Sequence, residues 1–181
     1  SGMLGLRSGN SLGEFGPLKT IPIASLHAGA YIFSVKTFDL DQDGIQDLAV
    51  GIFDCSGSRI IFLRGQGEGL FTESNVVPFP RARGMGLADF DGDSDPDFAA
   101  VSLMGELAVL ENKGSLLRAD SIERTSQVDM REQGLIPTGL EVLYLDAGAD
   151  PDLLVPTQRG VLTYLGSAGL SFEPRYSGII A

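Results

Sequence analysis

Hydrophobic positions in this chain form short runs that are separated by segments rich in aspartate or glycine. Residues 31–38 and 48–53 are two such runs, and both are rich in β-branched and aromatic side chains. Neither run shows the periodicity of about 3.6 residues that marks an amphipathic helix, so both are predicted to be β-strands. Three further strands are predicted on the same grounds, at residues 59–63, 106–110 and 161–165. Helix signals are sparse, and the pattern predicts an all-β fold.

The order of strands and turns repeats with a period near fifty residues, because acidic loops begin at Asp39 and again at Asp89. In each period an acidic loop joins a first strand to a second, and a third strand ends in a glycine-rich turn. Fourth strands are predicted to open near Phe71, Leu116 and Phe172. Four short strands in each repeat are the make-up of a β-propeller blade.

Each of the first two acidic loops carries aspartates at positions 1, 3, 5 and 9 and offers a backbone carbonyl at position 7. Such loops suit Ca²⁺, which takes about six to eight oxygen ligands. The sequence therefore predicts two calcium sites. Their ligands are Asp39, Asp41, Asp43, Ile45 and Asp47 in the first loop and Asp89, Asp91, Asp93, Asp95 and Asp97 in the second. An EF-hand is not indicated, because position 12 is Val50 or Ala100 rather than a bidentate glutamate.

The residue at position 6 of each loop is expected to have a positive φ angle, which glycine adopts without strain. Gly44 meets this requirement, whereas Ser94 carries a cost of about 1 kcal/mol. The first loop is therefore expected to hold calcium at least as well as the second. A third copy of the loop keeps Asp146 and Asp152 but places Tyr144 and Gly148 at two acidic positions, and we expect it to be empty.

These loops and turns resemble the FG-GAP or VCBS repeats of integrin-α-like calcium-binding β-propellers. The resemblance covers nearly the whole chain and implies one β-propeller region over residues 1–181, with four-stranded antiparallel blades. Blades are expected at residues 31–83, 84–138 and 139–181, and residues 4–30 match the outer half of a preceding blade. In that half, residues 4–7 match a third strand, and residues 8–15 lead into a fourth strand near Phe15.

About three and a half blades would leave open ends, since propellers close with roughly four to eight blades. Unpaired sheet edges are normally covered or paired in natural proteins. We therefore expect the chain to be a piece of a longer propeller, or to close a ring with another chain or with copies of itself.

The resemblance also implies that the calcium loops lie on one face of the propeller and that ligands meet the opposite face. The candidate residues on that second face are His27, Asp54, Arg81, Arg83 and Arg159. Arg81 and Arg83 stand out in an acidic chain and suit an acidic partner or an anionic sugar, although solvated arginines in loops are common.

Charge and composition narrow the classes of function. The formal net charge of −11 and the lack of a basic stripe argue against nucleic-acid binding. No apolar run reaches the roughly eighteen residues of a membrane helix. Cys55 is the only cysteine, which excludes an internal disulfide, and it is expected to be buried or half-buried. His27 is the only histidine and has no nucleophile beside it in the sequence, so a catalytic triad is not indicated.

Three function hypotheses follow. The leading one is a calcium-stabilised interaction or adhesion module that is not an enzyme and binds a protein partner. A lectin-like carbohydrate-binding propeller is the second, although the chain has no tryptophan and only four tyrosines for sugar stacking. The scaffold of a polysaccharide lyase or hydrolase is the third. An extracellular, periplasmic or cell-surface location is expected, because extracellular modules bind Ca²⁺ with dissociation constants of about 10⁻⁴ to 10⁻³ M.

Overall fold

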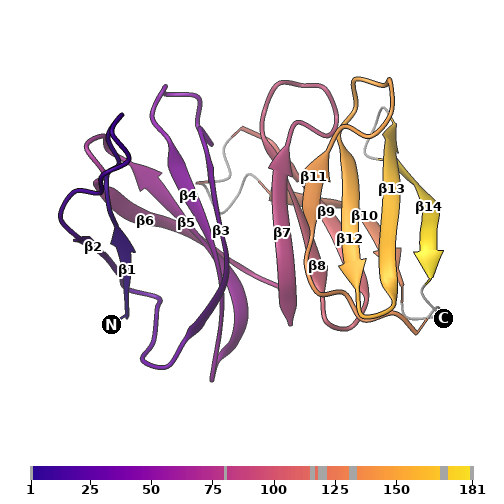
Figure 1. Ribbon diagram of the computed structural model, residues 1–181, viewed down its shortest axis with the longest axis horizontal. Coiled ribbons are helices and arrows are strands. Elements are labelled where there is room, and N and C mark those ends of the chain that lie inside the picture. The colour runs from indigo at the N-terminus through magenta and orange to yellow at the C-terminus, as the bar shows by residue number, and fades with distance from the viewer. Residues whose placement is uncertain are drawn as a thin grey trace.

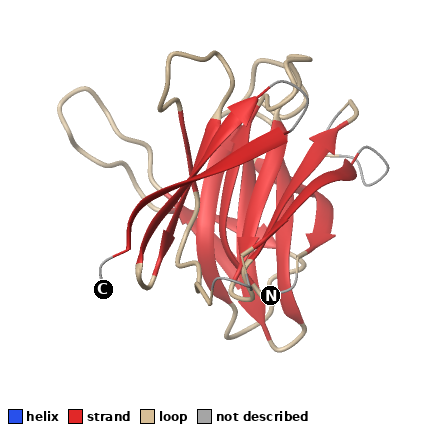
Figure 2. Cartoon of the chain, turned by 90° about the vertical axis from the view of Figure 1, so that its right-hand side faces the viewer, coloured by secondary structure: helices blue, strands red, loops and turns tan. Residues whose placement is uncertain are grey.

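The structure is a computed structural model that describes residues 2–79, 81–114, 117, 122–130, 134–167 and 171–179. These residues form fourteen strands and no helix (Figures 1 and 2). The strands belong to four sheets, and all strand pairs within them are antiparallel. The predicted all-β fold is therefore confirmed. No helix that could cross a membrane is found in the described ranges.

The four sheets follow one another along the chain. The first pairs β1 (Gly2–Leu6) with β2 (Lys19–Ile23). The second contains β3 (Tyr31–Phe38), β4 (Asp47–Asp54), β5 (Gly57–Gly65) and β6 (Phe71–Pro78). The third contains β7 (Ala82–Ala88), β8 (Asp97–Ser102), β9 (Glu106–Asn112) and β10 (Ile122–Asp129). The fourth contains β11 (Glu141–Leu143), β12 (Asp152–Thr157), β13 (Gly160–Ser167) and β14 (Ser171–Ile179).

Each four-stranded sheet is a simple meander, because strands that are neighbours in sequence are also neighbours in the sheet. The strands predicted from the apolar runs all lie within observed strands. Fourth strands open at Phe71 and Ser171, close to the predicted positions. The third predicted opening, Leu116, lies outside the described residues, and β10 begins at Ile122.

The first hairpin corrects the expectation that a fourth strand opens near Phe15. Strand β2 begins only at Lys19, and Phe15 makes a single bridge with Gly9. The intervening loop is organised by Asn10, whose side-chain oxygen accepts the backbone N–H groups of Leu12 and Glu14, each at 3.0 Å. An asparagine that satisfies its own loop in this way competes with strand pairing, which delays the start of β2.

The central strands of the second and third sheets are buried on both faces. In β5, Ile61 and Leu63 pack toward the first sheet, whereas Ile60 and Phe62 pack toward the third. The ring of Phe62 meets that of Phe98 in β8 edge to face, with centroids 5.8 Å apart. Side chains alternate between the two faces of a strand, so two-sided burial requires the continuous apolar runs seen in the sequence.

The first strands of the three meanders lie side by side. Strand β7 contacts both β3 and β11, and in Figure 1 it stands between the second and the fourth sheets. Two glycines of β7 permit this approach, because a Cβ on Gly84 or Gly86 would lie 2.3–2.4 Å from atoms of Leu140 or Val142. The first and last sheets lie at opposite ends of the row in the same view.

Candidate metal loops and ligand face

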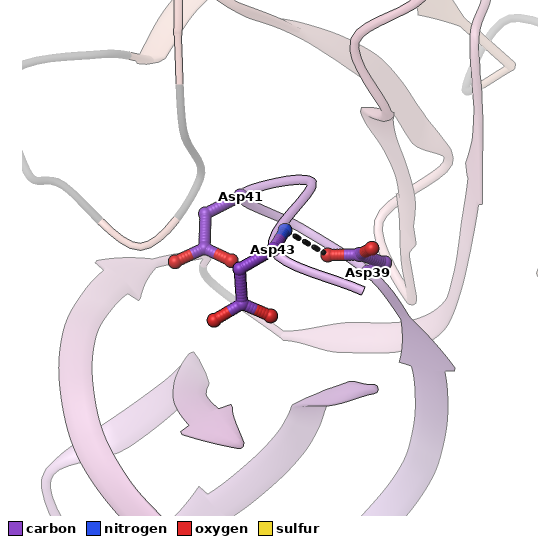
Figure 3. A group of neighbouring side chains, drawn as sticks. All are labelled: Asp39, Asp41 and Asp43. Carbon is purple, nitrogen blue, oxygen red and sulfur yellow. Dashed lines mark hydrogen bonds between the residues drawn. The ribbon is translucent and has the colours of Figure 1, made fainter. Parts of the chain in front are cut away.

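The first acidic loop brings three carboxylates together at the end of β3. Ligand oxygens of Asp39, Asp41 and Asp43 all lie within 4.8 Å of one another (Figure 3). The Asp39 carboxylate accepts the backbone N–H groups of Asp43, at 3.0 Å, and Gly44, at 2.8 Å. Asp41 Oδ1 is buried and has no hydrogen-bond partner in the described part of the chain. A cation with calcium–oxygen distances of about 2.3–2.6 Å fits this oxygen set and would give Asp41 Oδ1 its missing partner.

The second loop repeats the cluster with Asp89, Asp91 and Asp97, whose ligand oxygens also lie within 4.8 Å of one another. Desolvation by burial raises the pKa of Asp91. Asp93 is not part of this group, and Asp95 is predicted to offer its backbone carbonyl rather than its side chain. Asp93 Oδ1 accepts the backbone N–H of Asp95 at 2.8 Å, and Asp95 Oδ1 accepts the Gln42 side chain of the first loop at 2.8 Å. Gln42 thereby links the two acidic loops.

Both loops contain two residues with positive φ angles. Gly44 and Ser94, at position 6, have φ of 85° and 75°, which confirms the turn predicted there. Position 4 also has positive φ, at 57° for Gln42 and 83° for Gly92. Each loop therefore places one glycine and one residue with a Cβ at these two positions. The strain expected for the second loop alone is present in both.

Asp47, predicted as the position 9 ligand of the first loop, lies outside the group with metal-ligand spacing. Its carboxylate is fully buried and accepts two backbone N–H groups, from Leu40 at 2.8 Å and from Gly65 at 2.7 Å. Burial raises the pKa of Asp47, while these two hydrogen bonds act in the opposite direction. The residue ties the acidic loop to the glycine-rich turn after β5.

The same tie occurs in the next two sheets. Asp97 and Asp152 are both fully buried, and each accepts one N–H from the acidic loop and one from the end of the third strand. The donors are Phe90 and Asn112 for Asp97 and Leu145 and Gly166 for Asp152, at 2.5–2.9 Å. Burial raises the pKa of Asp97 to about 6. Because this aspartate accepts two backbone N–H groups, the third loop keeps it at position 9 even though the acids at positions 1 and 5 are missing.

In the third loop, Asp146 is exposed and its Oδ1 accepts the backbone N–H of Gly148 at 2.7 Å. The acidic groups with metal-ligand spacing that occur in the described residues lie in the first two loops. This absence of a third acidic group among the described residues agrees with the sequence of the third loop, in which Tyr144 and Gly148 stand at two of the acidic positions.

Arg64 is a site residue that the sequence analysis missed. Its Nη2 lies 2.8 Å from Asp41 Oδ2 and 3.2 Å from Asp43 Oδ2. Glu111 takes the corresponding place in the third sheet, since the next residues, Gly65 and Asn112, both donate their N–H to a position 9 aspartate. The Arg64 guanidinium therefore faces the aspartates of the first loop, whereas the Glu111 carboxylate faces those of the second. In the sequence, this difference is visible in the residue that precedes each glycine-rich turn, which is Arg64 in one repeat and Glu111 in the next.

At the opposite end of the second sheet, Asp54 is held by an arginine that the sequence analysis also missed. Arg59 pairs with the Asp54 carboxylate through both terminal nitrogens, at 3.0 and 2.7 Å. The Arg59 guanidinium, followed by the Ser56 hydroxyl, holds the pKa of Asp54 well below its usual range. His27 Nδ1 lies 3.0 Å from the same carboxylate. Asp54 is thus a structural anion of the turn rather than a free ligand group.

The remaining candidates are exposed. Arg81 and Arg83 lie at the start of β7, at the end of the sheet away from the acidic loops, and Arg159 lies in the turn between β12 and β13. Cys55 is also exposed, which corrects the expectation of a buried thiol. It lies in the tight turn after β4, where Asp54 is the residue that points inward.

A protein-family model described as an FG-GAP-like repeat matches residues 39–100. The match begins at the first aspartate of the first loop and ends in β8, so it includes both acidic clusters. No curated protein matches the chain. Residues 39–100 are therefore an FG-GAP-like repeat segment, which confirms the family resemblance of the loops and turns.

Proposed function

We propose that this chain is a calcium-stabilised interaction module of the β-propeller type that binds a protein partner. The observation that carries the proposal is the pair of loops that each gather three carboxylates within 4.8 Å, on a segment that matches an FG-GAP-like repeat. Three antiparallel meanders with adjoining first strands support the propeller-type arrangement. Further blades, or a second copy of the chain, would complete the ring.

Calcium in these loops would supply positive charge where carboxylates repel one another. Asp39, Asp41 and Asp43 would hold the ion in the first loop, and Asp89, Asp91 and Asp97 in the second. Because the loops connect first and second strands, we expect bound calcium to stabilise both hairpins. Extracellular, periplasmic or cell-surface placement is part of the proposal, since weak calcium modules fill at the calcium concentrations found there.

The proposed function is not enzymatic. His27 is the only histidine of the chain, and its Nδ1 is held by Asp54. The nearby hydroxyls are committed elsewhere, because Ser56 donates to Asp54 and Ser25 donates to Glu73. A serine nucleophile needs a hydrogen bond to its base, and neither hydroxyl provides one to His27.

Calcium titration by calorimetry tests the metal part of this proposal. We expect Asp41→Asn and Asp91→Asn each to abolish binding at one loop, because each removes a charged ligand oxygen. Asp146→Asn, in the third loop, is the matched control and should leave the stoichiometry unchanged. Unaltered stoichiometry in both loop variants would overturn the assignment.

The partner part is tested separately, with the calcium-loaded chain on parallel arrays of peptides and of glycans. Binding to peptides supports the proposal. Binding to glycans alone would contradict it and favour the lectin-like alternative.

A further inference from the structure

A pocket of about 350 Å³ opens at the end of the second and third sheets that lies away from the acidic loops. Tyr31 and Phe53, which face each other across β3 and β4, form one wall although both are more than half exposed. Phe33 and Leu103 complete the apolar lining. The Phe33 ring has space there because a Cβ on Gly51 would lie 2.4 Å from it.

The polar side chains that line this pocket can all donate hydrogen bonds, and the two arginines can only donate. Ser58 is 8% exposed, and its Oγ has no hydrogen-bond partner among the described residues. Arg83 makes no ion pair or side-chain hydrogen bond within the described ranges, and Arg81 contacts only the sulfur of Met104, at 3.3 Å. Arg81 also has a φ of 57°, a left-handed backbone that places this side chain at the rim. A buried hydroxyl without a partner is uncommon in folded proteins and suits a site that a ligand completes.

We propose that this pocket binds an acidic segment of a partner protein, in which a carboxylate adjoins an aromatic or large aliphatic side chain. This inference rests on the proposed function, since it names the chemistry that the interaction module recognises. The carboxylate would accept hydrogen bonds from Arg83 and Ser58, and the apolar side chain would lie between Tyr31 and Phe53. Charge complementarity supports an anionic occupant, because two unpaired arginines meet at one pocket of a chain with a net charge of −11.

The lining favours a peptide over an anionic sugar. Tyr31, Phe33, Phe53 and Leu103 offer a largely apolar surface, against which sugar hydroxyls would lose water without gaining hydrogen bonds. An aromatic or aliphatic side chain gains free energy from the same burial. The volume lies near the lower end of ligand pockets, about 300 Å³, and suits one large side chain with its carboxylate.

Saturation-transfer NMR with small probes tests the proposal on the calcium-loaded full chain. The probes are N-acetylphenylalanine, its neutral amide and glucuronate. We expect only N-acetylphenylalanine to bind, with a dissociation constant on the order of 1 mM given its few atoms. Arg83→Gln should weaken binding about tenfold and Ser58→Ala about fivefold, through loss of hydrogen bonds to a charged group.

Arg7→Gln removes an exposed arginine in the first hairpin and is the matched control, which should bind the probe as the unaltered chain does. Arg83 is exposed, so its replacement is expected to leave the fold intact, and the melting curve verifies this. Equal binding of the neutral amide, or binding of glucuronate alone, would overturn the inference. Absence of probe binding with normal calcium stoichiometry would overturn it and leave the metal assignment intact.

Discussion

Single residues make the two acidic loops unequal. Arg64 places a guanidinium 2.8 Å from a carboxylate oxygen of Asp41, while Glu111 adds a negative charge at the corresponding place by the second loop. The Coulomb contribution of Glu111 raises the pKa of Asp91 further. Arg64 would compete with calcium for Asp41 and Asp43 in the first loop, whereas Glu111, which is paired with Lys113 at 3.5 Å, adds an anion beside the second. From these charges we expect the second loop to bind calcium more tightly than the first, which differs from the order expected from Gly44 and Ser94.

Arg64→Gln tests this order. The substitution removes a half-exposed cation that competes for Asp41 and Asp43, and such pairs contribute up to about 1 kcal/mol. We expect the calcium affinity of the first loop to rise about twofold to fivefold, with the second loop unchanged, as measured by calorimetry. Arg159→Gln, which removes an exposed cation in the turn between β12 and β13, is the control. An unaltered or lower affinity at the first loop would contradict the role assigned to Arg64.

Backbone strain at Ser94 gives a second prediction for single residues. At a φ of 75°, a residue with a Cβ costs about 1 kcal/mol relative to glycine. We expect Ser94→Gly to raise the free energy of unfolding by about this amount, and Gly44→Ala, at a φ of 85°, to lower it by a similar amount. Urea denaturation measures both. Destabilisation by Ser94→Gly would show that its side chain supports the loop in a way that outweighs the strain.

Between elements, the position 9 aspartates bind each acidic loop to the turn that follows the third strand. Asp152 shows this role most clearly, because the third loop lacks the acids needed for an ion. Its carboxylate accepts N–H groups from Leu145 and Gly166 on two separate segments. These hydrogen bonds therefore hold the connection between β11 and β12 against the end of β13.

Asp152→Ala isolates the structural part of this tie. Two backbone N–H groups would lose their acceptor, and each buried unsatisfied group costs about 1–3 kcal/mol. We expect the free energy of unfolding to fall by about 2–4 kcal/mol, equally with and without calcium. Asp146→Ala, at an exposed position of the same loop, should change it little. Equal effects of the two substitutions in urea denaturation would argue against the tie.

In the molecule as a whole, one face of the last sheet has no neighbouring sheet among the described residues. Leu162 and Tyr164 of β13 are buried against the third sheet, so the alternating residues Val161 and Leu165 point to the other face, where they are only half-buried. The positions that correspond to Val161 in the second and third sheets, Ile60 and Leu107, are fully buried. Half-exposed apolar faces of this kind favour association.

We therefore expect the isolated chain to associate with itself as its concentration rises. Sedimentation velocity over the micromolar range measures this. Val161→Glu should weaken the association by placing a charge on the open face, whereas Leu12→Glu, in an exposed loop of the first hairpin, should not. A chain that stays monomeric throughout, with no effect of Val161→Glu, would contradict the prediction.

The sequence alone determined the strands and the acidic loops, because both depend on residues that are close together along the chain. Runs such as residues 60–63 are apolar at every position, which two-sided burial in a sheet explains, and they lie within β5. The positive φ at Gly44 follows from the shape of a tight loop. Alternate spacing along five residues likewise places three aspartates of the first loop with ligand oxygens within 4.8 Å of one another.

Only the tertiary structure decided the partners of these residues. The pairings of Arg64 with Asp41, of Asp152 with Gly166 and of Gln42 with Asp95 depend on strand register or on the packing of neighbouring sheets. The pocket beside Ser58 likewise needs two sheets in contact. Register and sheet packing are set by the sum of many apolar contacts across the cores, and no short stretch of sequence carries that sum. The aspartates of each loop are therefore set by the local sequence, whereas the charged residues that lie beside each loop are set by the tertiary fold.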